Sequence, residues 1–303
     1  MIKKDCLTVG YNTAGQEFFD LLQTYHPYIN SYFFSALHGQ EFWDKFDPDS
    51  FIKDLEAVNT YNLKGNILFN YKRDEEDFDF LQGLVSRILD SGKINLTQIT
   101  IATPQTCEKI RKLFPQLEIH LSVHYSKNYD LKDCIGLCDC VNLSSVFEFN
   151  AFDKIKFLKD NNIKVKYILN KGCLPNREIN YKNFEGSKEV SCELCNSSCF
   201  KLFEKYPWLK LSRIFYYLEM IEKFYPTIDL WKLPTRETPT KDIVPILQYL
   251  ILQKRTKFIE GVDITPHYQE FLDWISERVL CDNLCYKCDI CKKYWEIFSG
   301  NKK

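Results

Sequence analysis

The sequence predicts a (β/α)8 barrel similar to a TIM barrel, followed by a cysteine-rich C-terminal extension. Eight short apolar runs alternate with segments of helical periodicity. The connections are only a few residues long, apart from one insertion after the seventh run. A length of 303 residues suits one barrel of about 250 residues with an extension. A doubly wound open sheet is the alternative architecture.

The eight predicted strands are rich in β-branched or aromatic residues and end at polar or turn residues. They cover residues 7–11, 29–37, 66–71, 98–102, 117–124, 139–146, 163–169 and 228–233. The fifth strand, which reads LEIHLSVH, alternates between apolar and polar residues, as expected for a strand with two different faces. On this strand His120 is expected to lie deep in the core.

Helices are predicted between the strands. They cover residues 15–24, 74–89, 107–114, 151–160, 214–224 and 240–252. In the second of these, Phe78, Leu81 and Val85 recur at helical spacing. Pro104 ends the fourth strand, and Thr106 is expected to cap the helix that follows.

The cysteines divide the predicted chain into two regions. Residues 1–255 form the α/β barrel, with a cysteine-bearing insertion at 173–212. Residues 256–303 form the C-terminal cysteine-rich extension.

Composition narrows the possible function classes. With 40 basic and 41 acidic residues, the net charge of −1 gives no global attraction to nucleic acid or anionic membranes. No apolar run reaches the roughly 20 residues that span a bilayer, and no apolar signal core follows the N-terminus. We therefore expect a cytoplasmic protein without membrane contact. Glycine motifs for dinucleotides or for a P-loop are also missing from the sequence.

Thirteen cysteines are the most informative feature. Their odd number and close clustering disfavour a disulfide framework. Four of them, Cys281, Cys285, Cys288 and Cys291, lie within eleven residues near the C-terminus. This spacing is cramped for one zinc ion and suits a 4Fe–4S cluster better. Zinc is the alternative metal. The remaining alternative is a tail of reduced cysteines that binds no metal.

A second group of cysteines surrounds the end of the seventh strand. Cys173 follows that strand directly, and Cys192, Cys195 and Cys199 lie in the insertion. One thiolate at a strand end and three in a loop form a plausible four-thiolate site, so one or two clusters are expected. A third group, Cys134, Cys138 and Cys140, has no evident fourth ligand, and we interpret its members as small core residues.

Polar residues at strand ends are the candidates for chemistry at the barrel mouth. His124 is the candidate proton donor, and Arg236 is the candidate for gripping an anionic substrate. The candidates for substrate binding also follow strands: Asn70, Tyr71, Asn170 and Lys232. For His124 a structural hydrogen bond, and for Arg236 a salt bridge across the barrel rim, are the competing interpretations.

Several stretches resemble the collagenase-like peptidase family U-32 and its iron–sulfur relatives. The stretches are LEIHLSVHYSKN at 117–128, IKVKYILNKGCLPN at 163–176 and LWKLPTRETPT at 230–240. The second is similar to a family strand that ends in Asn-Glu-Gly-Cys-Leu-Pro-Asn. The sequence departs from the family at Lys171, where Glu is common, and at Arg177, where a second cysteine often follows.

The resemblance implies a barrel that carries a cysteine-bound 4Fe–4S cluster, with Cys173 as one ligand. It also implies oxygen-independent hydroxylation or another redox modification of a small organic substrate or an RNA base, with a protein partner or electron donor. Peptidase activity is less well supported, because the sequence has neither Gly-x-Ser-x-Gly nor His-Glu-x-x-His. The alternatives are a cysteine- or metal-dependent hydrolase and a zinc-stapled binding or scaffold protein.

Overall fold

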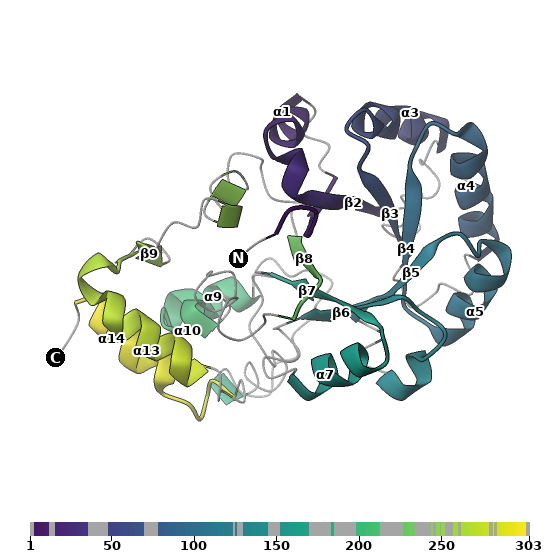
Figure 1. The fold of residues 1–303 in the computed structure, drawn as a ribbon. Coiled ribbons are helices and arrows are strands. Elements are labelled where there is room, and N and C mark those ends of the chain that lie inside the picture. Colours follow the sequence, from purple (N-terminus) through teal and green to yellow (C-terminus); the bar gives the residue numbers. More distant parts are fainter. Residues whose placement is uncertain are drawn as a thin grey trace.

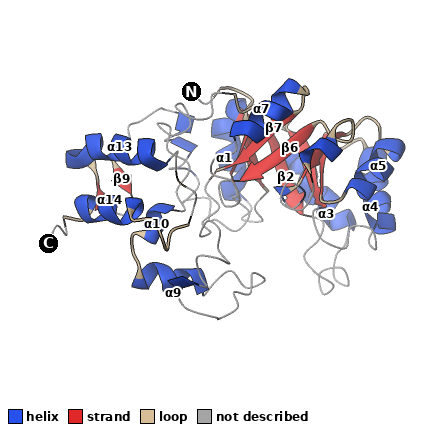
Figure 2. Ribbon diagram, turned by 90° about the horizontal axis from the view of Figure 1, so that it is seen from below, coloured by secondary structure: helices blue, strands red, loops and turns tan. Residues whose placement is uncertain are grey.

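Eight parallel strands form a closed barrel (Figure 1). The barrel and its helices occupy one side of the molecule, and α13 (Tyr268–Arg278) and α14 (Ile290–Phe298) lie at the other (Figure 1 and Figure 2). The structure is a computed structural model. It describes residues 3–11, 16–35, 48–69, 78–123, 125, 130–144, 152–169, 183–184, 198–212, 227–233, 244, 247–248, 250–251, 257–259, 262–278, 281 and 284–300. The predicted α/β barrel is confirmed, and the open sheet is excluded because the last strand pairs with the first.

The strands follow one another around the barrel in sequence order. They are β1 (Leu7–Gly10), β2 (Ile29–Ser35), β3 (Lys64–Phe69), β4 (Leu96–Ile101), β5 (Glu118–Leu121), β6 (Cys140–Ser144), β7 (Lys164–Ile168) and β8 (Leu230–Leu233). At the closure, Leu7 lies opposite Trp231 and Thr8 lies opposite Lys232. All the carboxyl ends of the strands therefore meet at one face, where barrel enzymes place their active sites.

Helices cover the outside of the barrel (Figure 2). They are α1 (Gln16–Tyr25), α3 (Pro48–Asn59), α4 (Phe78–Ser91), α5 (Pro104–Leu113) and α7 (Phe152–Asp160), with short 3-10 helices η1 (His26–Tyr28) and η2 (Leu131–Cys134). Helix α3 was not predicted, although Ile52, Leu55 and Val58 recur at helical spacing in the sequence and are buried.

The N-terminus of α5 corrects one prediction. Thr103, and not Thr106, is the N-cap, and its hydroxyl oxygen accepts a hydrogen bond from the Thr106 backbone N–H at 3.4 Å. Pro104 occupies the first helical position, where its missing N–H costs nothing. The predicted helix start at residue 107 is three residues later than the observed start at Pro104, because a proline after a strand was interpreted as the end of that strand.

The two faces of the strands differ in polarity. Outward-facing residues such as Ile67, Ile99 and Ile119 are apolar and join the core between the strands and the helices. Alternate residues such as Asn66 and Gln98 point into the barrel and are polar. Interiors of such barrels are dominated by bulky branched residues, so this polar filling is unusual.

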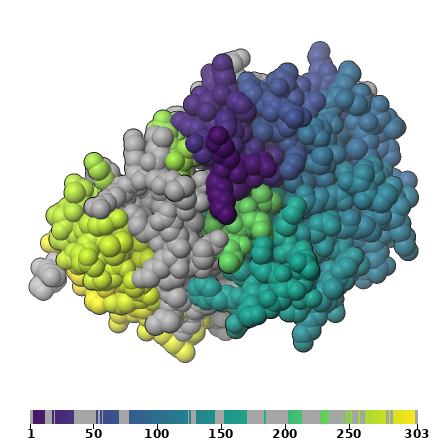
Figure 3. Space-filling view, viewed as in Figure 1, coloured from purple at the N-terminus to yellow at the C-terminus, as the bar shows by residue number. Residues whose placement is uncertain are grey.

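The cysteine-bearing insertion and the C-terminal extension contribute helices beside the barrel. Helices α9 (Ser198–Lys205) and α10 (Leu209–Ser212) belong to the insertion. The extension contains β9 (Phe258–Ile259), β10 (Val262–Asp263), η3 (Thr265–His267), α13 (Tyr268–Arg278) and α14 (Ile290–Phe298). Helix α14 packs on both α13 and α10. Figure 3 shows the C-terminal residues gathered at one side of the molecule, opposite the barrel helices of the first half.

Among the described residues, no helix has the length and apolar character that a membrane span requires.

Candidate metal centre and barrel interior

Most of the predicted mouth residues lie outside the described residues. This holds for His124, Arg236, Asn70, Tyr71 and Asn170, and for three predicted metal ligands, Cys173, Cys192 and Cys195. Cys199 lies in α9, where only the backbone is described. The roles assigned to these residues therefore stay predictions. The four C-terminal cysteines and Lys232 can be placed.

The structure brings the four C-terminal cysteines together between α13 and α14. Cys281 follows α13, Cys285 and Cys288 lie in the connecting segment, and Cys291 is in the first turn of α14. Cys281 and Cys291 are buried, and Cys285 and Cys288 are partly buried. We refer to these four residues as the C-terminal cysteine cluster. Two backbone hydrogen bonds close the turn: from Cys281 N–H to the Arg278 carbonyl at 3.1 Å, and from Lys287 N–H to the Leu284 carbonyl at 2.9 Å.

The thiols of this cluster interact with one another. A hydrogen bond with Cys281, followed by burial, raises the pKa of Cys288. Burial, followed by the charge of Cys291, raises the pKa of Cys285 to about 12. Without a metal ion, the raised pKa values of Cys285 and Cys288 favour the protonated thiols near neutral pH. A soft metal ion reverses this preference, because a coordinated thiol loses its proton.

Arg278 reaches into the cluster from the last turn of α13. Its side chain is fully buried, with an exposed fraction of 0%. One guanidinium nitrogen donates to Cys281 Sγ at 2.8 Å, and the other donates to the Ser212 carbonyl of α10 at 3.0 Å. Arg278 was not predicted to be part of this site. Its spacing from Phe271, Trp274 and Ile275 nevertheless places it on the same buried face of α13.

The donor set of the cluster fits a thiolate-bound metal, since four sulfur atoms are the ligands that zinc and iron–sulfur clusters take. In the described residues, no three His, Cys, Asp or Glu side chains are grouped so that they could hold a metal ion. The chemistry of the residues thus fits such a group, while the sulfur atoms are not arranged as a finished coordination sphere.

Lys232 lies at the carboxyl end of β8, as the sequence predicts. Its Nζ lies 4.1 Å from the centre of the Phe33 ring, a cation–π contact across the barrel mouth. In the strand register Lys232 lies between Thr8 of β1 and Ile168 of β7. The side chain is only partly buried, so its charge is at the face where a substrate would enter.

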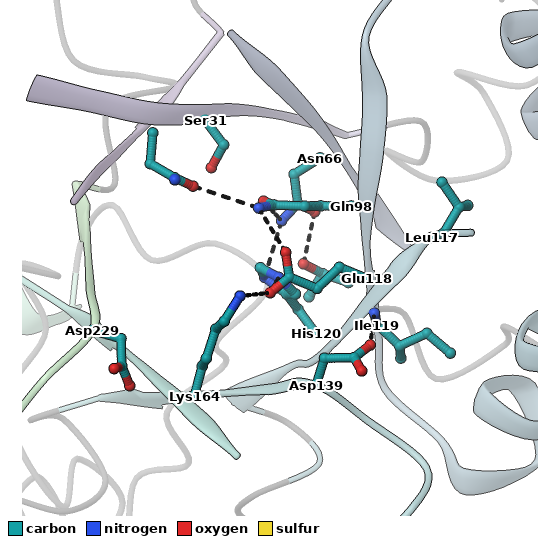
Figure 4. A network of polar contacts seen from close by, with 12 residues as sticks. Ser31, Asn66, Gln98, Leu117, Glu118, Ile119, His120, Asp139, Lys164 and Asp229 are labelled. Atoms are coloured by element: carbon teal, nitrogen blue, oxygen red, sulfur yellow. Dashed lines mark hydrogen bonds and ion pairs between the residues drawn. The ribbon is translucent and has the colours of Figure 1, made fainter. Parts of the chain in front are cut away.

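A network of polar side chains fills the barrel (Figure 4). The Asn66 amide donates to Gln98 Oε1 at 3.2 Å and lies 3.3 Å from His120 Nδ1. Gln98 in turn donates to Glu118 Oε2 at 3.2 Å, and Lys164 Nζ donates to Glu118 Oε1 at 2.8 Å. These contacts link β3, β4, β5 and β7, and they end at charged residues on the amino-terminal side of the strands.

His120 lies at the centre of this network. Burial, followed by the positive charge of Lys166, lowers the pKa of His120 to about 4. The ring is therefore neutral, and Nδ1 accepts from the Asn66 amide, so the proton is on Nε2, which lies 3.5 Å from Glu118 Oε1. Its complete burial confirms the core position predicted from the sequence.

Lys166 is the second buried cation that the sequence analysis missed. It is 1% exposed, and burial lowers its pKa to about 8. A signal was present, because Lys164 and Lys166 occupy one face of the run IKVKYIL. Lys164 reaches Glu118 at the barrel end, whereas Lys166 lies beside Cys140 in the interior.

The third cysteine group is buried. Cys134 and Cys138 have exposed fractions of 0% and 7%, and Cys140 is completely buried in β6. A Cys138 Sγ contact to the Cys134 carbonyl measures 3.7 Å. Burial raises the pKa of Cys140 to about 12. These positions agree with the interpretation of the group as small core residues.

No protein-family model matches the sequence, and no curated protein matches it. Among solved structures, the chain is similar to one titled "Crystal structure of the N-terminal domain of a putative aldolase from Bacteroides vulgatus". The two share 14% sequence identity with a TM-score of 0.37, over 82% of this chain and 99% of that chain.

Proposed function

We propose that this protein is an iron–sulfur barrel enzyme whose C-terminal cysteine cluster holds a 4Fe–4S cluster. The observation that carries the proposal is the buried Arg278 guanidinium, which donates to Cys281 Sγ at 2.8 Å. A buried cation is costly unless an anion compensates it. Thiolates bound to a metal would place such an anion directly beside the guanidinium. The surroundings of these cysteines are therefore suited to the deprotonated, ligating form.

The reaction proposed for this enzyme is an oxygen-independent redox modification, such as hydroxylation, of an organic substrate or an RNA base. The chemistry that a bound cluster supplies is one-electron transfer. All four cysteines of the cluster would be ligands, which favours electron transfer over direct binding of substrate. A redox partner, protein or small molecule, is then required to exchange electrons with the cluster.

The barrel supplies the proposed substrate site. Lys232 Nζ provides positive charge at the carboxyl ends of the strands and stands over the Phe33 ring. Below it, the interior offers amide, hydroxyl and imidazole groups, which suits a polar substrate better than an aliphatic one. Substrate roles for His124, Arg236, Asn70, Tyr71 and Asn170 are part of this proposal and rest on their positions in the sequence.

A zinc-stapled structural site is the second candidate, and a specific observation favours it. The C-terminal cysteine cluster joins the ends of α13 and α14, and Arg278 links it to the last residue of α10 through the Ser212 carbonyl. Closed four-cysteine sites that hold helices together are typical of structural zinc. In that case the extension would present a binding surface, and the cluster would have no redox role.

Strictly anaerobic purification, followed by counting iron, sulfide and zinc per chain, distinguishes the two candidates. We expect about four irons and four sulfides, or twice that number, with a brown absorbance that dithionite bleaches. Stoichiometric zinc in a colourless protein would instead support the structural site. A chain free of both metals would contradict both candidates.

Cysteine variants then locate the metal. Replacing Cys285 and Cys288 together by serine should abolish the metal bound by the C-terminal cysteine cluster. Cys6→Ser is the matched control, because Cys6 is a buried cysteine directly before β1, outside the three cysteine groups, and its Sγ contacts the Lys3 carbonyl at 2.9 Å. Cys173→Ala should remove a second cluster, if two are present, without unfolding the barrel. Full iron retention in Cys173→Ala would restrict the chain to one site.

A further inference from the structure

Arg278 is a permanent charge in a fully buried position. It lies on the face of α13 that also carries Phe271, Trp274 and Ile275, all of them buried. An arginine does not lose its proton in proteins. Burial of such a group is tolerated only when hydrogen bonds and an opposite charge compensate it.

The acidic residue next to Arg278 is directed elsewhere. Glu277 Oε1 accepts hydrogen bonds from the Tyr294 hydroxyl at 2.7 Å and from Lys293 Nζ at 3.0 Å. The Glu277 side chain is 40% exposed, and Lys293 is 57% exposed. This carboxylate therefore belongs to a surface ion pair between α13 and α14.

The Arg278 guanidinium lies against the C-terminal cysteine cluster, with Cys281 Sγ within hydrogen-bond distance of one of its nitrogens. The guanidinium is held at two points, by Cys281 Sγ and by the Ser212 carbonyl. Its position is therefore set by two separate segments of the chain, α10 and the turn after α13.

We infer that Arg278 is the internal counter-ion of the metal–thiolate centre and that it positions the thiolates for binding. This inference rests on the function proposed above. Four thiolates around a dication, or around an oxidised 4Fe–4S cluster, keep a net negative charge in a buried place. Arg278 neutralises part of that charge and donates a charge-assisted hydrogen bond to one of the ligands. Such partners tune both the affinity for the metal and the reduction potential of a cluster.

The test compares Arg278→Met, which removes the charge, with Arg278→Lys, which keeps the charge and loses the planar fork. Arg87→Met on the exposed surface of α4 is the matched control. Apparent affinity is measured in the whole protein by competition with a chromophoric chelator, using Co²⁺ or Zn²⁺ as the probe. Iron-loaded protein is titrated with dithionite in the presence of redox dyes.

We expect Arg278→Met to bind the probe 10- to 100-fold more weakly than the wild type, which is the usual effect of losing an outer-shell partner. Its cluster should also be harder to reduce. Arg278→Lys should lie between the two, and Arg87→Met should match the wild type.

Two outcomes would contradict the inference, and they can be distinguished. A wild type that binds metal, with Arg278→Met equal to it in affinity and potential, would overturn the inference and leave the proposed function standing. A wild type that binds no metal would overturn both. Circular dichroism confirms that each variant is folded. If Arg278→Met does not fold, an affinity of Arg278→Lys equal to the wild type overturns the inference, and a weaker one supports it.

Discussion

Two buried cations, Arg278 and Lys166, are accommodated by this chain in different ways. Arg278 keeps its charge and donates hydrogen bonds to Cys281 Sγ and to the Ser212 carbonyl. Lys166 lies in the barrel, where burial lowers its pKa to about 8. A lysine can give up its proton when it is buried, whereas an arginine cannot. The charge of Lys166 inside the barrel therefore depends on pH, whereas the charge of Arg278 beside the C-terminal cysteine cluster does not.

Lys166→Met should stabilise the protein near neutral pH. A pKa that falls from 10.5 to about 8 on folding means that the charged lysine is disfavoured in the native state by roughly 3 kcal/mol. A methionine of similar length removes this cost, and we expect a gain of about 1–3 kcal/mol in the free energy of unfolding at pH 7. Urea unfolding measures the gain, and Lys112→Met on the exposed surface of α5 is the control.

The sign of the pH dependence follows from the same shift. Below pH 8 Lys166 is protonated in both the folded and the unfolded chain, so the free-energy cost of burying the charged lysine is fully present. Between pH 8 and 10.5 only the unfolded chain keeps the proton, and stability of the wild type rises relative to the variant. The advantage of Lys166→Met should therefore shrink as the pH rises through this window. An advantage that is constant with pH would contradict the lowered pKa.

At the scale of elements, the strands were predictable because their outward faces are almost uniformly apolar. Ile67, Ile99 and Ile119 carry this signal, and each of the eight predicted strands overlaps an observed one. Their ends were less predictable. The fifth strand was expected to reach residue 124, but β5 ends at Leu121, because alternation of side chains persists beyond the last residue that forms ladder hydrogen bonds.

The proximity of the four C-terminal cysteines was predictable from their spacing, but the link from Arg278 to α10 was not. Cysteines at 281, 285, 288 and 291 are close in sequence, so they are necessarily close in space. Arg278 and Ser212 are brought to them by the packing of α14 on α13 and α10. The contact between residues 212 and 278 depends on tertiary structure, and no local pattern encodes it.

The helix cap of α5 provides a test at the element scale. Thr103→Ala should lower the free energy of unfolding by about 1 kcal/mol, because it leaves the Thr106 N–H without its side-chain acceptor. Thr103→Ser keeps the hydroxyl and should restore most of the loss. Thermal or urea unfolding of the two variants measures the difference. If alanine and serine are equally stable at this position, Thr103 is not the cap.

At the scale of the whole molecule, the barrel and the cysteine-bearing helices are held together in different ways. The barrel closes through eight parallel strand pairs, each made by backbone hydrogen bonds. The helices of the insertion have a small apolar cluster of their own, made by Leu202, Phe203 and Leu209, and Cys285 packs against it. Cys291 of α14 belongs to the large core, so the thiolate centre proposed here would tie the small cluster to that core.

Removal of metal should therefore loosen one part of the molecule and not the other. Hydrogen exchange of the metal-loaded protein, compared with protein stripped by a chelator under reducing conditions, measures this. We expect faster exchange in α9, α10 and α14, since a bound metal would tie Cys291 of α14 to the turn after α13, and Arg278 ties that turn to α10. The amides of β1 to β8 should stay protected, because their partners are other strands. Equal loss of protection in strands and helices would mean that the two regions unfold as one cooperative unit, which would contradict a local role for the metal.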